Sequence, residues 1–189
     1  SILLAGMSSL GKTTVIEPSL SRDHTERMLK YFGAKIKTVQ LEDKSWQITL
    51  DETRELKALD IDVPSDPSSA AFPIVASITT PNSKVTIRNV CVNKLRTGLY
   101  KTLIEMGAKI EFKNKRKING ELVADIIASS SNLIGVNIPK SRAASMIDEY
   151  PILSIAASFA KSPSIFRGLR ELRVKESDRL KLINLNLLK

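Results

Sequence analysis

The sequence predicts an α/β fold, α+β in arrangement, that is built from repeated β-α-β-β units. The repeat is visible in the sequence, because Gly33-Ala-Lys-Ile36 returns as Gly107-Ala-Lys-Ile110. A β-branched run that favours a strand precedes each copy, at 13–16 and at 85–88. A third unit begins at 164–167, and we expect it to be cut short near the end of the sequence. Units of this length must pack against their neighbours to bury their apolar faces.

Within each copy, a helix is expected between the β-branched run and the glycine. Apolar residues recur there at helical spacing, namely Met28 and Phe32 in the first copy and Leu99, Leu103 and Met106 in the second. The glycine follows each stripe directly, which is the position of a helix C-cap. A short strand is expected next, at 35–40 and at 109–113.

Each unit closes with a further strand that runs into an acidic helix start. The expected strands are 60–64 and 136–139, and Asp66 and Asp148 follow them with a proline close behind. Aspartate before an apolar run, with proline in the first turn, is typical of a helix N-terminus. We therefore expect Asp148 at the start of an apolar helix over 151–159.

The composition is that of an ordinary globular protein with a basic surface. Hydrophobic residues make up 42% of 189, and 29 basic against 20 acidic residues give a formal charge of +9. This surplus favours anionic ligands. One Trp, three Tyr and five Phe are too few for a base-stacking nucleic-acid surface, and no apolar run approaches the ~18 residues of a membrane span.

The single cysteine, Cys91, excludes a disulfide framework and suits a reducing compartment. We also find no charged-then-apolar leader. A cytoplasmic protein is therefore expected. Because the sequence opens on Ser1, its numbering is expected to start inside a longer protein.

Residues 6–13 match the phosphate-loop pattern G-x-x-x-x-G-K-[ST] letter for letter. In a nucleotide-binding loop a helix follows the lysine, and its amide groups hold the phosphates. Here β-branched residues and then Pro18 follow Lys12, which favours a strand. We expect a helix over 2–7 that turns through Gly11 into a strand, and a P-loop nucleotide-binding protein is a disfavoured alternative.

The segment 21–27 lies where a strand passes into a helix. Asp23 and Glu26 have the spacing of a capping pair. Arg22 then lies just outside the helix N-terminus, where a guanidinium and amide groups can bind an anion together. The alternative is a surface ion pair of Arg22 with either acid. His24 is expected to be a hydrogen-bonded residue of the helix start, not a catalytic group.

The segment 173–180 is rich in charge. If a helix starts near Lys175, that lysine and Arg179 are at i, i+4, and Glu176 is at i, i+3 from Arg179. Two cations can bind a doubly anionic ligand while a carboxylate between them stays available for proton transfer. A surface ladder of salt bridges would produce the same pattern, and the spacing alone leaves both explanations open.

Five strings of this chain carry a family resemblance: VIEP at 15–18, SRDHTERM at 21–28, DPSSAAFP at 66–73, SMIDEYP at 145–151 and ELRVKESDRL at 171–180. Together they resemble EPSP synthase, the 3-phosphoshikimate 1-carboxyvinyltransferase family, in its bacterial class II form. The resemblance covers nearly the whole chain in one register, and its first and last strings are the most specific.

The resemblance implies the enolpyruvyl transferase fold, an inside-out α/β barrel that is incomplete here. Each of the family's two domains holds three β-α-β-α-β-β units. Residues 1–62 resemble the C-terminal part of the second domain, and 63–189 resemble the returning part of the first domain, truncated. Ser65 stands where the family usually has glycine, at the crossover between domains, and we expect it to stiffen the hinge.

Members of this family transfer the enolpyruvyl group of phosphoenolpyruvate to the 5-hydroxyl of shikimate 3-phosphate, a step of chorismate and aromatic amino-acid biosynthesis, and no cofactor or metal is expected. By resemblance, Asp148 is the base that takes the hydroxyl proton and grips the shikimate ring, and Glu176 is the acid that protonates the methylene carbon. Arg22 and Lys175 resemble contacts to shikimate 3-phosphate. Arg179 resembles a contact to phosphoenolpyruvate.

The family's other motifs are missing, among them the N-terminal Lys-Ser-x-x-x-Arg. We therefore expect this chain alone to be inactive, and a second chain with the missing halves is a partner that the resemblance allows. One alternative is a non-catalytic remnant of a split or decayed gene. Another is the sibling UDP-N-acetylglucosamine enolpyruvyl transferase, which the strings at 22–25 and 173–179 disfavour.

Overall fold

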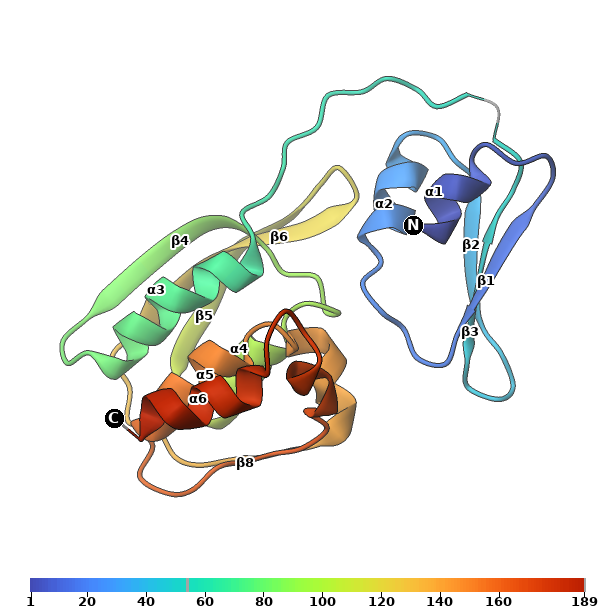
Figure 1. Ribbon diagram of the computed structural model, residues 1–189. Helices are drawn as coiled ribbons and strands as arrows, with labels where there is room; N and C mark the ends of the chain where they lie inside the picture. The colour runs from blue at the N-terminus through green and yellow to red at the C-terminus, as the bar shows by residue number, and fades with distance from the viewer. Residues whose placement is uncertain (54, 189) are drawn as a thin grey trace. The chain divides into compact units, whose positions relative to one another are not determined.

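The computed structural model describes residues 1–53 and 55–188, which divide into two units (Figure 1). Unit 1 comprises Ser1–Pro64 and Lys117–Leu122, and unit 2 comprises Ser65–Arg116 and Val123–Lys189. Among the described residues, no helix combines the length and the apolar character needed to cross a membrane.

Unit 1 is an antiparallel three-stranded sheet with two helices. The strand order is β1-β3-β2, so β3, the last strand of this sheet in sequence, lies in the centre. Its elements are α1 (Ile2–Gly6), β1 (Thr13–Glu17), α2 (His24–Tyr31), β2 (Ile36–Gln40) and β3 (Trp46–Leu50). The core of this unit is small, with buried Leu3, Leu29, Ala34, Ile48 and Leu50.

The turn between α1 and β1 contains the residues that match the phosphate-loop pattern. The chain enters β1 directly after Lys12, and Gly11 takes a left-handed φ of 82°. Gly6 packs so closely that a Cβ there would lie 2.5 Å from Oγ1 of Thr13. A strand, not a helix, follows the lysine in this stretch. The expected helix, turn and strand are confirmed, and the pattern lacks the helix N-terminus that phosphate binding requires.

Unit 2 repeats this topology and adds helices. Its three-stranded sheet has the order β4-β6-β5, again with the last strand of the sheet in the centre. Its elements are α3 (Pro67–Thr79), β4 (Lys84–Cys91), α4 (Gly98–Glu105), β5 (Lys109–Ile118), β6 (Glu121–Ser129), β7 (Asn137–Ile138), the 3-10 helix η1 (Lys140–Met146), α5 (Tyr150–Ser158), β8 (Ile165–Phe166), the 3-10 helix η2 (Arg170–Arg173) and α6 (Arg179–Leu187).

The shared strand order confirms the repeat predicted from sequence. Gly33 and Gly107 end their helices with φ of 95° and 93°, as expected for C-cap glycines. The strand predicted at 136–139 is β7, and the third unit opens with β8, which pairs with β7 in parallel.

The core of unit 2 lies between its sheet and its helices. In Figure 1, α3 runs along β4, and Oγ of Ser77 in α3 donates to the carbonyl of Ala128 in β6 at 3.1 Å. The completely buried residues include Ile74 and Ile78 of α3, Leu103 of α4 and Ile126 of β6. These helices cover the sheet and hold the chain on which the candidate site is built.

The strand predicted at 60–64 is wrong, because these residues form no regular structure. Pairing begins only at Ser65, which makes a single bridge to Val90 of β4. The Ser65 amide donates to the carbonyl of Asn89 at 2.8 Å, and the Cys91 amide donates to the carbonyl of Ser65 at 3.0 Å. Ser65 is not among the residues with positive φ, so this backbone accepts serine without strain.

Two predicted helix starts are also wrong. Glu149, not Asp148, occupies the N-cap of α5. The last helix, α6, begins at Arg179 instead of near Lys175, because the Asp178 side chain caps it by accepting the amide of Lys181 at 3.0 Å. A side chain that competes for the backbone in this way sets the boundary more strongly than the spacing of charges.

Candidate active site

Three of the predicted site residues meet around Arg179 in unit 2. The Arg179 guanidinium lies 3.4 Å from Oδ1 of Asp148 and 2.6 Å from Oε2 of Glu176. The side chains of Arg179 and Asp148 are 24% and 33% exposed, whereas that of Glu176 is 77% exposed. One cation therefore brings the two predicted acid–base residues together at the surface of this unit.

The local course of the chain explains this meeting. Asp148 lies between buried Ile147 and buried Glu149, where η1 passes into α5, so that its side chain faces outward. Arg179 is the first residue of α6, and Glu176 lies in the loop before it. The predicted i, i+3 pair of Glu176 and Arg179 is confirmed, although only Arg179 belongs to the helix and Glu176 lies in the loop before it.

Hydrogen bonds favour the charged forms of both partners in that pair. A hydrogen bond from its own backbone amide, and then one from Arg179, lower the pKa of Glu176 below its usual range. The hydrogen bond to Glu176 in turn raises the pKa of Arg179. Glu176 is therefore a carboxylate in the ligand-free chain, and it needs a change in its surroundings before it can donate a proton.

Lys175 pairs with an acidic residue of η2, and the helical face predicted for it with Arg179 does not form. Its Nζ lies 2.8 Å from Oε1 of Glu171, in an i, i+4 ion pair that joins the loop before α6 to η2. Because α6 begins only at Arg179, Lys175 and Arg179 do not share a helical face. The Lys175 side chain is 26% exposed, so an anion that displaced Glu171 could reach it.

The wall behind Arg179 is apolar. A pocket of about 420 Å³ lies next to it, formed by α5, α6 and the Phe72 side chain of α3. Ile155 and Leu182 line it from the two facing helices. Water is partly excluded on this side, so the attraction of Arg179 for an anion is stronger than it would be for a fully solvated side chain.

Arg22 belongs to unit 1, where it lies between β1 and α2. It lines a pocket of about 210 Å³ together with Glu17, Ser21, Thr25 and Glu26. Partial burial raises the pKa of Glu26 above its usual range. Arg22 is therefore a cation of a small polar pocket that also holds the carboxylates of Glu17 and Glu26.

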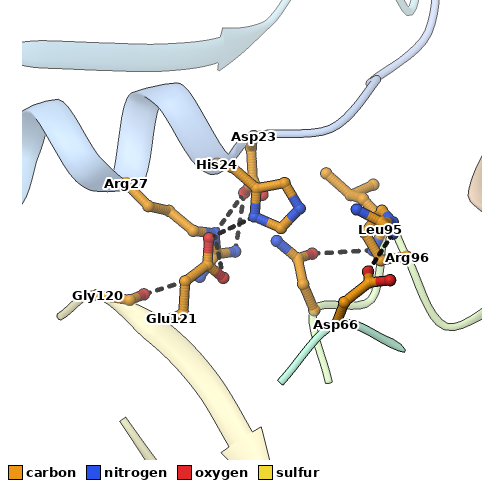
Figure 2. A network of polar contacts seen from close by, with 9 residues as sticks. Asp23, His24, Arg27, Asp66, Leu95, Arg96, Gly120 and Glu121 are labelled. Atoms are coloured by element: carbon orange, nitrogen blue, oxygen red, sulfur yellow. Dashed lines mark hydrogen bonds and ion pairs between the residues drawn. The ribbon is translucent and has the colours of Figure 1, made fainter. Parts of the chain in front are cut away.

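His24 begins α2 and is hydrogen-bonded, as predicted (Figure 2). Its Nδ1 lies 2.6 Å from Oε1 of Glu121. Asp23 is the N-cap residue, but its side chain does not cap the helix; it accepts from Nε of Arg27 at 2.8 Å. The predicted capping pair of Asp23 and Glu26 is therefore wrong. Arg27 also donates to the carbonyl of Gly120 at 3.2 Å.

Sequence reasoning missed a polar cluster of unit 2, formed by Ser68, Arg96 and the buried Glu149. Arg96 joins Oδ1 of Asp66 at 3.1 Å (Figure 2) and Oγ of Ser68 at 2.7 Å. Glu149 is only 3% exposed. An acidic residue at a helix start is usually solvated, so no local signal marked Glu149 as buried.

Comparison with known proteins identifies the family. The family model for EPSP synthase (3-phosphoshikimate 1-carboxyvinyltransferase) matches residues 1–189. The chain is 54% identical to the 3-phosphoshikimate 1-carboxyvinyltransferase of Bartonella quintana, over 95% of this chain and 40% of the relative, and 53% identical to that of Paramagnetospirillum magneticum, with the same coverage.

A solved structure gives the same result. The structure of EPSP synthase from Acinetobacter baumannii superposes with a TM-score of 0.87 at 42% sequence identity, over 97% of this chain and 40% of that one. The chain therefore belongs to the EPSP synthase family of transferases, and it has the family's mixed α/β fold in incomplete form. It spans about 40% of the length of the relatives it matches.

Proposed function

We propose that this chain supplies one part of the active site of an enolpyruvyl transferase of the shikimate pathway, which joins phosphoenolpyruvate to the 5-hydroxyl of shikimate 3-phosphate. The observation that carries the proposal is the contact of Arg179 with both Asp148 and Glu176. A base, an acid and an anion-binding cation are the groups that this reaction needs. Family membership supports the same substrates.

In the proposed reaction, Asp148 takes the proton of the 5-hydroxyl, and Glu176 gives a proton to the methylene carbon of phosphoenolpyruvate. Protonation makes the neighbouring carbon electrophilic, so the hydroxyl oxygen bonds to it. Phosphate then leaves and one methyl proton returns to Glu176, which restores the double bond. Arg179 binds the carboxylate of phosphoenolpyruvate, while Arg22 and Lys175 bind shikimate 3-phosphate.

Substrate binding would also give Glu176 its proton. The carboxylate of phosphoenolpyruvate competes for Arg179, which removes one of the hydrogen bonds that lower the Glu176 pKa. Two polyanionic substrates nearby add negative charge, which disfavours a second carboxylate. Both effects raise the pKa of Glu176, so that it becomes an acid only when the substrates are bound.

We also propose that the 189-residue chain alone has no measurable turnover, because proximity and orientation require the residues that the rest of the family's length provides. Those residues would come from the same chain or from a second chain. The proposed compartment is the cytoplasm, which suits a lone cysteine.

A non-catalytic remnant of a split or decayed gene is the second candidate function. Family motifs in frame on both sides of the coding sequence would exclude it.

The proposal can be tested in a chimera in which this chain replaces its counterpart in the Bartonella quintana relative. We expect the chimera to be active, and Asp148→Asn and Glu176→Gln each to lower kcat by about 10²–10⁴-fold. Glu111→Gln is the matched control, since Glu111 is also an exposed, ion-paired carboxylate, 2.9 Å from Lys113. Full activity of Asp148→Asn or Glu176→Gln would contradict the proposed roles.

A further inference from the structure

The residue after the proposed base is an unusual helix N-cap. Glu149 occupies that position in α5, but its side chain makes no capping hydrogen bond. The carboxylate points instead into unit 2, where its Oε1 accepts a hydrogen bond from Oγ of Ser68 in α3. Burying a carboxylate to 3% exposure costs free energy that capping would not have cost. Such a cost suggests a role beyond ending a helix.

The free-energy cost of burying Glu149 is offset by polar groups at the start of α3 and in the loop before α4. Ser68 donates to Glu149 and accepts from Nη2 of Arg96 at 2.7 Å, and Arg96 also donates to Oδ1 of Asp66 at 3.1 Å. The Arg96 side chain is only 13% exposed. Burial first, and then the charges of Glu149 and Asp66, raise the pKa of Tyr100 nearby. The hydroxyl of Ser68 therefore links the buried carboxylate of Glu149 to the guanidinium of Arg96.

This network holds the backbone on both sides of Asp148. Ile147, Glu149 and Tyr150 are 7%, 3% and 1% exposed, and the ring of Tyr150 lies 5.8 Å from that of Phe166. Asp148 is the one residue of this run whose side chain reaches the surface, to meet Arg179. A carboxylate on an anchored backbone has fewer orientations to lose when it binds a substrate hydroxyl.

We propose that Glu149, linked through Ser68 to Arg96, is a positioning residue that orients Asp148 toward the substrate hydroxyl. The inference rests on the proposed function, because it assigns Glu149 no contact with substrate and acts only through Asp148. The alternative is that the network only stabilises the fold. The two differ in one respect: a positioning network loses its effect when Asp148 itself is replaced.

Ser68→Ala in the chimera tests the link, since it removes the hydroxyl and keeps both charges. We expect kcat to fall about tenfold, in keeping with the cost of a small misplacement of catalytic groups, with KM for phosphoenolpyruvate within about twofold. Ser68→Thr keeps the hydroxyl and should restore most of kcat. Ser77→Ala is the control, because Ser77 is a buried serine of the same helix α3 whose hydroxyl donates to a β6 carbonyl and not to Glu149.

A double-mutant cycle separates positioning from stability. The readout is the Kd of shikimate 3-phosphate, measured by calorimetry for Ser68→Ala, Asp148→Asn and the double variant. We expect each single variant to bind more weakly and the double variant to bind like Asp148→Asn. Equal kcat for Ser68→Ala and Ser77→Ala, or an undiminished Ser68→Ala effect on Kd in the Asp148→Asn background, would overturn the inference alone. Full activity of Asp148→Asn would overturn it together with the proposed function.

Discussion

Units 1 and 2 have the same β-α-β-β topology but bury their helices to different degrees. In unit 1, α2 has one buried residue, Leu29, whereas in unit 2, α4 buries Leu99, Tyr100 and Leu103. The difference comes from α3 and α5, which pack on each other and on the elements around α4. A repeated sequence pattern thus sets the order of strands, and additional helices set how much of each unit is shielded from water.

The same contrast holds for the chemistry. Unit 1 contributes Arg22, a cation beside a small pocket. Unit 2 contributes Asp148 and Glu176, together with the buried carboxylate Glu149. A buried carboxylate requires a shielded and compensated environment, and among the described residues only unit 2 has helix starts packed closely enough to provide one.

The largest effect is expected from leucines at equivalent positions of the repeat. Leu103 and Leu29 each lie four residues before the C-cap glycine, at 0% and 2% exposure. We expect Leu103→Ala to cost about 3–5 kcal/mol, because its dense surroundings cannot collapse into the cavity, and Leu29→Ala to cost about 2–3 kcal/mol. Urea unfolding followed by circular dichroism and by the fluorescence of Trp46, in unit 1, measures both.

Leu10→Ala is the control for that pair, because Leu10 is 93% exposed and its loss should cost less than about 0.5 kcal/mol. Equal losses for Leu103→Ala and Leu29→Ala would show that the helices of unit 2 add no packing around α4.

A smaller effect is expected at the C-cap glycines. Alanine at either site must take a left-handed conformation, which costs about 1–2 kcal/mol. At Gly107 the new Cβ would also lie 3.2 Å from the carbonyl of Asn132, whereas at Gly33 it would meet only the flexible Lys57 side chain at 3.8 Å. We therefore expect Gly107→Ala to lower the free energy of unfolding more than Gly33→Ala does.

Gly11→Ala measures the cost of the left-handed backbone alone, because Gly11 has a φ of 82° and no atom lies within 4 Å of its Cβ position. Its cost should match that of Gly33→Ala. The comparison fails if Gly107→Ala is no worse than Gly11→Ala in the same urea titration.

The smallest effect is on pH dependence. Burial opposes the ionisation of Asp66, but hydrogen bonds from Ser69 and the charge of Arg96 outweigh it and lower the pKa. Asp66 therefore stabilises unit 2 above about pH 4, the unfolded pKa, and this contribution is lost as the pH falls through its folded value. Burial raises the pKa of Glu26 in unit 1 instead, so protonation there favours the folded state as the pH falls.

We thus expect the urea midpoint of unit 2 to fall more steeply than that of unit 1 between pH 6 and pH 3. Asp66→Asn should reduce this steepness, at a cost of about 1 kcal/mol or less at neutral pH, because asparagine also serves as an N-cap. A pH profile that Asp66→Asn leaves unchanged would rule out this carboxylate as the cause.

Much of the fold was predictable because it is encoded locally. The alternation of β-branched and polar residues, the apolar stripe and the glycine that ends it are all present within one copy of the repeat. One further signal could have been used: Asn119-Gly120, whose φ angles of 49° and 85° form the turn between β5 and β6. The strand at 60–64 failed as a prediction because these residues form no strand, and pairing with β4 begins only at Ser65.

The sequence by itself determined the repeat, the family and the residues that the family's motifs mark as chemical. Packing decided which residue stands at the N-cap of α5, which carboxylate is buried, and that Arg179 joins Asp148 to Glu176. The physical reason is distance along the chain. A motif is a local pattern, whereas the burial of Glu149 depends on Ser68 and Arg96, which only packing brings to it.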